Sequence, residues 1–114
     1  MSKAKDAILP DRSDPIMRTV PMPADLNGNG HIFGGWVLSQ MDIAGGLLVK
    51  RVSHSACATV AIDSMSFIAP VHVGDIVSVY GDIERIGRTS VAVKLEVIAT
   101  RRETDEDVKV TEGV

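Results

Sequence analysis

The stretch 34–52 constrains the fold more than any other part of the chain. Its apolar side chains recur at steps of three and four residues, which predicts a helix. The neighbouring faces of this helix are also apolar, so we expect other structure to wrap it rather than leave it on a surface. Asp42 interrupts the apolar pattern, although a charge in apolar surroundings is costly unless it is compensated.

After the helix the apolar period changes to two, which is typical of strands. Alternation predicts strands over 57–68, 76–86, 90–100 and 108–114, the last still running where the sequence stops. A short strand over 16–22 precedes the helix, and Pro21 and Pro23 limit it to an edge or a strand end. One wrapped helix with a meander of antiparallel strands indicates an α+β fold in which the sheet curls around the helix.

Composition bounds the class of protein. The 114 residues are enough for one domain, so we expect a mobile arm over 1–14 and a single domain over 15–114. Apolar residues make up 45% and charged residues 24%, and the net charge of −3 argues against a nucleic-acid partner held by a general basic field. No apolar run is long enough to span a membrane and the N-terminus lacks the apolar stretch of a signal peptide, so we expect a cytoplasmic protein without a membrane partner.

Residues that commonly bind metals are sparse. Cys57 is the only cysteine, which excludes an intrachain disulfide and a thiolate cluster in this chain. His31, His54 and His72 are scattered and lack the spacing of a ligand motif, so no metal site is expected.

The loop before the helix offers hydrogen-bond donors. A tight turn explains the Asn–Gly pattern over 27–30 by itself. Gly34 and Gly35, however, stand at the helix start, where free N–H groups and the positive end of the helix dipole can hold a developing oxyanion. Asn27 can add an amide hydrogen bond. Asp42, about two turns further on, is either a buried carboxylate that caps backbone N–H groups or a catalytic group, namely a general base that activates water or a nucleophile.

Two other features of the helix have a structural explanation. Ser39 lacks the G-x-S-x-G surroundings of a nucleophile, so its hydroxyl is expected to be solvated or bonded back to the helix. Gly45 and Gly46 each cost about 1 kcal/mol relative to alanine in a helix interior. We expect them to allow close packing of the helix against the sheet.

These motifs carry a family resemblance. The pattern N-x-x-G-x-I-F-G-G-W over 27–36, followed by S-Q-M-D over 39–42, resembles the YciA-type acyl-CoA thioesterases. The likeness continues through 64–77 and 86–97. It implies a hotdog fold, in which an antiparallel sheet wraps a central helix, and therefore a single hotdog thioesterase domain over 15–114. It also implies homodimers whose sheets join, assembled further into hexamers.

The resemblance further implies an activity and a site. Members of the family hydrolyse acyl-CoA to a fatty acid and coenzyme A, and their catalytic carboxylate matches Asp42, which would activate water. The amide of Gly35 and the side chain of Asn27 would stabilise the oxyanion. Gly34 and Phe33 would contact the substrate, although Phe33 is better explained as a core or interface residue. The thioester is already an activated electrophile, so no cofactor is expected.

The turn after the strand 76–86 has two explanations. Arg88, Thr89 and Ser90 are typical of a solvated hairpin. Alternatively, they contact the phosphates of coenzyme A, because a guanidinium and two hydroxyls suit that anion.

The strand over 57–68 carries few charges, so as a free edge it would be unprotected against other chains. We expect it to pair with its symmetry mate in a homodimer. The resemblance implies that this contact brings the Asn27 loop of one subunit near Asp42 of the other, which makes two composite sites per dimer.

Two other functions compete with hydrolysis on the same fold. A non-catalytic module that binds acyl groups or coenzyme A would not need the carboxylate, so Asp42 counts against it. A hotdog dehydratase would need a histidine beside the helix, and His31 is not at a matching position. Relatives in the family continue past the position of Val114, so we expect the last strand, which family topology places inside the sheet, to be cut short.

Overall fold

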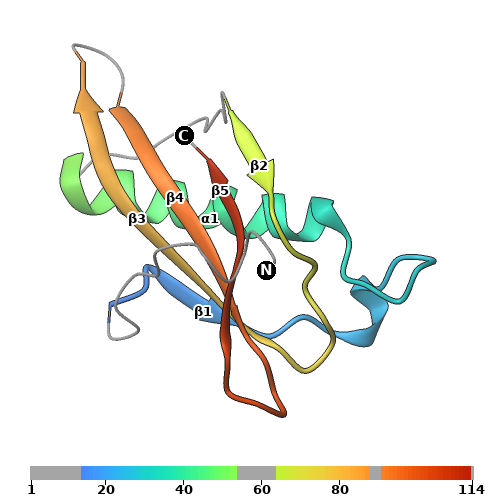
Figure 1. Cartoon of the computed structure of the whole chain (residues 1–114). Helices are drawn as coiled ribbons and strands as arrows, with labels where there is room; N and C mark the ends of the chain where they lie inside the picture. Colours follow the sequence, from blue (N-terminus) through green and yellow to red (C-terminus); the bar gives the residue numbers. More distant parts are fainter. Residues whose placement is uncertain (1–13, 54–63, 88–90, 114) are drawn as a thin grey trace.

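The computed structural model describes residues 14–53, 64–87 and 91–113. Its elements, in chain order, are β1 (Met17–Thr19), the 3-10 helix η1 (Pro23–Asp25), α1 (Gly34–Ser53), β2 (Met65–Phe67), β3 (Ile76–Ile86), β4 (Val91–Thr100) and β5 (Asp107–Gly113). The strands form one antiparallel sheet in the order β1-β3-β4-β5-β2, and α1 lies across one face of it (Figure 1). The α+β prediction is confirmed.

The strands agree with the alternation in the sequence, with differences at the edges of the sheet. β3, β4 and β5 match their predicted ranges to within about a residue, and β5 lies inside the sheet between β4 and β2. The strand predicted over 16–22 shortens to β1. Of the strand predicted over 57–68, only 64–68 belong to the described residues, and β2 occupies Met65–Phe67.

The sheet covers α1 on one side only. Val37, Met41 and Ala44 recur at steps of four and three residues and are buried in the core. The opposite side keeps apolar side chains in solvent, namely Leu38, Ile43 and Leu47. The prediction of a helix wrapped all round is therefore wrong for the single chain, because one sheet can cover only one face of a helix.

One strand glycine is closely surrounded by apolar side chains, one of them from α1. A Cβ at Gly81 of β3 would lie 2.7 Å from Ile16 Cδ1, 2.8 Å from Leu95 Cδ2 and 3.2 Å from Leu48 Cδ2. A Cβ at Gly46 would meet no atom within 4 Å. The prediction of close packing is therefore wrong for Gly46, and the position that requires a missing side chain lies in β3.

Charged side chains join the strands on the face of the sheet away from α1. Lys109 of β5 forms ion pairs with Glu96 of β4 (3.4 Å) and with Glu112 (2.7 Å). Burial lowers the pKa of Lys109, but the hydrogen bond to Glu112 and the charges of both carboxylates outweigh this, so the pKa is raised overall. Lys109 is therefore held charged on a nearly buried position, where it ties β5 to β4.

Candidate functional site

A cavity of about 380 Å³ lies at the N-terminal end of α1. Most of its wall is apolar and includes Ile32, Val37, Phe67, Ile68, Val71 and Val110. Asn27, His31 and Gly34 supply polar groups. Sites for small molecules are commonly apolar cavities of about 300–1,000 Å³ with a few polar groups that fix orientation, and this cavity fits that description.

Hydrogen bonds close the loop beside the cavity. Asn27 Oδ1 accepts from the backbone N–H of Asn29 (2.8 Å) and of His31 (3.1 Å). Gly30, with a φ of +80°, donates its N–H to the carbonyl of Asn27 (3.2 Å). The predicted tight turn is confirmed. Because Asn27 Oδ1 is engaged within the loop, the group that this side chain can offer to a ligand is its Nδ2 donor.

The start of α1 leaves two donors open. The N–H of Phe33 donates to the carbonyl of Asp25 (2.9 Å), and the N–H groups of Trp36 and Val37 both donate to the carbonyl of Phe33. The N–H groups of Gly34 and Gly35 have no backbone acceptor among the residues that the structure describes. The helix therefore presents two amides with its positive dipole end, next to the polar side of the cavity.

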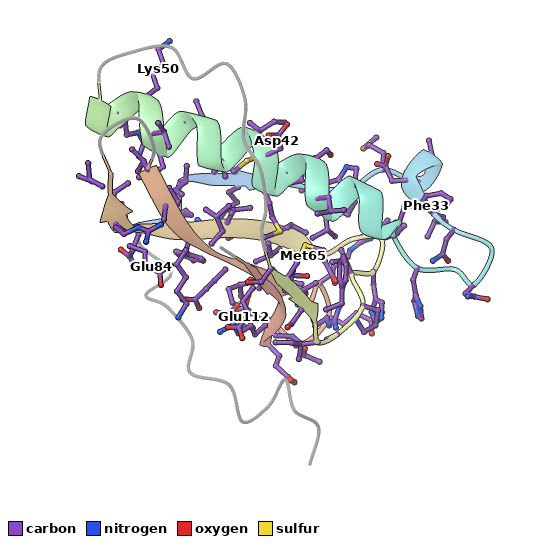
Figure 2. All side chains as sticks on the ribbon, turned by 90° about the horizontal axis from the view of Figure 1, so that it is seen from above. Phe33, Asp42, Lys50, Met65, Glu84 and Glu112 are labelled. Atoms are coloured by element: carbon purple, nitrogen blue, oxygen red, sulfur yellow. The ribbon has the colours of Figure 1, made fainter. Side chains whose placement is uncertain are left out.

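Asp42 does not reach this cavity within one chain. It lies about two turns beyond Gly35, roughly 10 Å along the helix axis, and it is exposed. Figure 2 shows it near the middle of α1, on the side turned away from the strands, whereas Phe33 lies at the N-terminal end of the helix. The expectation of a buried carboxylate is therefore wrong for the single chain. Exposed apolar residues lie beside it on the same face of α1.

The structure brings only part of the predicted site together. Asn27 and Gly34 line the cavity, whereas Phe33 and Gly35 are exposed and are not among its lining residues. The hydroxyl of Ser39 donates to the carbonyl of Trp36 (2.7 Å), so the back-bonded interpretation of that residue is confirmed. Three predicted residues lie outside the described part of the chain, namely Arg88, Thr89 and Ser90.

Phe67 is one of several wall residues that sequence reasoning did not assign to the site. If Gly34 carried a Cβ, its three nearest atoms would all be ring carbons of Phe67, at 3.3, 3.7 and 3.9 Å. The alternating pattern of its strand gives the face on which Phe67 lies. It gives no sign that the first turn of α1 stands directly above it.

A buried ion pair supports the far side of the cavity. Asp75 is 2% exposed, and its Oδ2 lies 2.5 Å from Arg101 Nη1. The same oxygen accepts from the N–H of His72 (2.8 Å), while Arg101 Nη2 donates to the carbonyl of Pro70 (3.0 Å). Gly74, with a φ of +95°, completes the turn. Arg101 therefore fixes the position of this turn, which leads into β3.

The turn over 71–75 also holds the loop of Asn27 in place. The N–H of Ile32 donates to the carbonyl of Val71 (3.0 Å). The rings of His31 and His72 stack, with centroids 5.4 Å apart and planes inclined by 21°. A continuous set of contacts therefore leads from the ion pair to the polar side of the cavity.

We expect the free energy of unfolding to fall as the pH is lowered through about 6.5. Burial lowers the pKa of His72 from 6.5, the charge of Arg101 lowers it further, and His31 adds to this while Asp75 opposes it. The unfolded chain therefore takes up this proton at a higher pH than the folded chain, so stability is lost between 6.5 and the lower folded value. Thermal unfolding of the protein and of His72→Gln, followed from about pH 7.5 to about pH 5, measures the effect. A difference between the two proteins that does not change with pH would contradict it.

Two classes of site find no support in the described residues. Within 14–53, 64–87 and 91–113, no three His, Cys, Asp or Glu side chains are grouped so that they could hold a metal ion. In the same ranges no helix has the length and apolar character needed to cross a bilayer. Cys57 and His54 lie outside these ranges.

Comparison with known proteins identifies relatives of this chain. Residues 29–105 match the family model of the thioesterase superfamily. An acyl-CoA thioester hydrolase of Haemophilus influenzae, described as uncharacterized, is 50% identical over 82 residues, which cover 72% of this chain and 53% of that protein. The acyl-CoA thioester hydrolase YciA of Escherichia coli is 48% identical over 86 residues, which cover 75% of this chain and 65% of that protein. The aligned part thus spans less than two thirds of either relative.

Solved structures extend the likeness to the fold. A hexameric thioesterase of Yersinia pestis matches with a TM-score of 0.83 at 39% identity, over 93% of this chain and 90% of that one. A hexameric hotdog-fold thioesterase of Campylobacter jejuni matches with a TM-score of 0.84 at 37% identity, over 91% of this chain and 80% of that one. The predicted hotdog fold is confirmed.

Proposed function

The chain belongs to the thioesterase superfamily, and from this premise we propose that it hydrolyses the thioester of acyl-CoA to a fatty acid and coenzyme A. The observation that carries the proposal is the largely apolar cavity that Gly34 lines, at the helix start where the amides of Gly34 and Gly35 are open. A thioester joins an apolar acyl chain to a carbonyl whose oxygen becomes negative during attack. The cavity suits the chain, and the amides suit the oxygen.

The chemistry needs an oxyanion site and a base. The Gly35 amide and the Nδ2 donor of Asn27 stabilise the negative oxygen when water attacks the carbonyl carbon. Asp42 accepts the proton of that water and then passes it to the sulfur as the C–S bond breaks. The products are the carboxylic acid and the thiol of coenzyme A, so no redox partner or cofactor enters the balance.

Two features support a site shared between copies of the chain. Asp42 lies on the exposed apolar face of α1, which a second copy would cover. β2 is an edge strand, and pairing it with its symmetry mate would satisfy its open backbone groups. In this dimer the Asn27 loop of one subunit faces Asp42 of the other. Three such dimers then form a hexamer, and the thioesterases of Yersinia pestis and Campylobacter jejuni are described as hexameric.

Mixing two inactive variants tests the shared site. Asp42→Asn and Asn27→Ala each damage both sites of their own dimers, but a mixed dimer keeps one site with both native residues. After statistical exchange we expect about a quarter of the native activity, because half of the dimers are mixed and each holds one intact site.

Subunit exchange is established first by native mass spectrometry of chains with different tags. If exchange is complete and activity stays at the level of the two separate variants, Asn27 and Asp42 act within one chain and the shared site is wrong.

A panel of acyl-CoA substrates with detection of the free thiol tests the activity itself. We expect turnover with saturable kinetics. The alternative, a module that binds acyl groups or coenzyme A without catalysis, is favoured if the folded protein binds these substrates and releases no thiol. The contact of Arg88, Thr89 and Ser90 with the phosphates of coenzyme A belongs to the same proposal, since it adds binding energy distant from the reacting bond.

A further inference from the structure

Phe67 differs from the buried walls of the cavity in its exposure. Ile32, Val37, Val71 and Val110 are at most 5% exposed, so close packing on all sides holds them in place. Phe67 is 53% exposed and ends β2, the edge strand beside the start of α1 (Figure 1).

The position of the Phe67 ring relative to the open amides of Gly34 and Gly35 matters as much as its exposure. Its nearest carbon lies 3.3 Å from the place that a Cβ of Gly34 would take. If the proposed function holds, the thioester carbonyl is fixed at Gly34 and Gly35, and the acyl chain enters the cavity from that point. The ring of Phe67 then lies beside the acyl chain where the chain enters the cavity.

We propose that Phe67 is the specificity-determining residue of this site and that its ring sets the length of the acyl chain that the cavity accepts. The inference rests on the proposed function and names its substrate class, medium-chain acyl-CoA. An apolar cavity of about 150 Å³ holds a benzene ring. The cavity of about 380 Å³ is more than twice that size, so it has room for an acyl chain longer than six carbons.

Substitutions of Phe67 in opposite directions test the inference. Phe67→Ala enlarges the cavity, so the ratio of kcat/KM for hexadecanoyl-CoA to that for octanoyl-CoA is expected to rise tenfold or more, since a single methylene in a pocket is worth about 10–200-fold. Phe67→Trp fills the cavity and is expected to lower the same ratio. Ile86→Ala is the matched control, because Ile86 is 65% exposed at the far end of β3 and should leave the ratio unchanged.

Gly34→Ala tests the contact itself. Its new methyl would press against the Phe67 ring, so the chain-length ratio should change in the native background. In the Phe67→Ala background the same substitution should leave the ratio unchanged, because the ring is no longer there. An equal change in both backgrounds would mean that Gly34 acts without Phe67 and would overturn the inference.

The experiments distinguish a failure of the inference from a failure of the proposed function. If the native protein cleaves acyl-CoA and the chain-length profiles of Phe67→Ala and Phe67→Trp coincide with its own, the inference is overturned and the function stands. If the native protein cleaves no acyl-CoA, the function is overturned. Dissociation constants of S-alkyl-CoA thioethers of increasing length, measured by calorimetry on the same three proteins, then decide the inference without any turnover. Circular dichroism confirms that each variant is folded.

Discussion

Asp42→Asn is expected to lower kcat for acyl-CoA hydrolysis by about 10²–10⁴-fold, the usual loss when a positioned base is removed. The amide has the shape of the carboxylate but cannot take a proton from water. Asp42 is exposed in the single chain and supports no core packing, so the melting temperature and the dissociation constant of coenzyme A should stay at their native values. Steady-state kinetics with thiol detection, together with calorimetry, measure all three quantities.

Asp82→Asn is the matched control for this experiment. It makes the same chemical change at an exposed position of β3, away from the cavity and from the exposed face of α1. Its kcat should equal that of the native protein. Near-native turnover of Asp42→Asn would remove this carboxylate from the mechanism and leave it as an ordinary surface residue.

Arg101→Met is expected to lower the free energy of unfolding by about 3–5 kcal/mol, the cost of leaving one partner of a buried ion pair uncompensated. Asp75 is nearly fully buried and would lose the guanidinium that balances its charge. The carbonyl of Pro70 would lose its donor as well. Urea denaturation followed by circular dichroism gives the change directly.

Two further variants show whether the unpaired carboxylate of Asp75 causes the loss in the free energy of unfolding. Asp75→Leu combined with Arg101→Met removes both charges and should recover part of the stability, because a buried pair can often be replaced by apolar side chains. Arg102→Met, at the exposed neighbouring position, should change stability by less than about 0.5 kcal/mol. If the double variant is no more stable than Arg101→Met, lost packing rather than the unpaired carboxylate explains the effect.

The elements of this fold are local features, and the sequence predicts them well. The period of three to four residues over 34–52 and the period of two in the strands depend only on near neighbours along the chain. The exposure of the two sides of α1, in contrast, depends on how the helix packs against the rest of the molecule. The spacing of Val37, Met41 and Ala44 agrees with the side that meets the sheet. The other side of the helix is also apolar, so its sequence carries no sign that the single chain leaves Leu38, Ile43 and Leu47 exposed.

The same limit applies to the site. Asn27, Gly34 and Gly35 could be grouped in advance because the chain itself keeps them together in one loop and one helix start. Phe67 reaches Gly34 through the register of β2 on β5, and Asp75 meets Arg101 across two strands. Contacts of this kind depend on how the sheet assembles, and no short motif encodes them.

The strand order also has a consequence for how the chain folds during synthesis. Among the described residues, β2 is joined to the sheet through β5, and β1 through β3, so each early strand pairs with a partner that is made later. While the chain leaves the ribosome, α1 and the hairpin of β3 and β4 can form before β2 has a place to dock. The wall that Phe67 contributes is therefore completed last. Because such long loops must close before the pairing stabilises them, the docking of β2 should be the slow phase of folding.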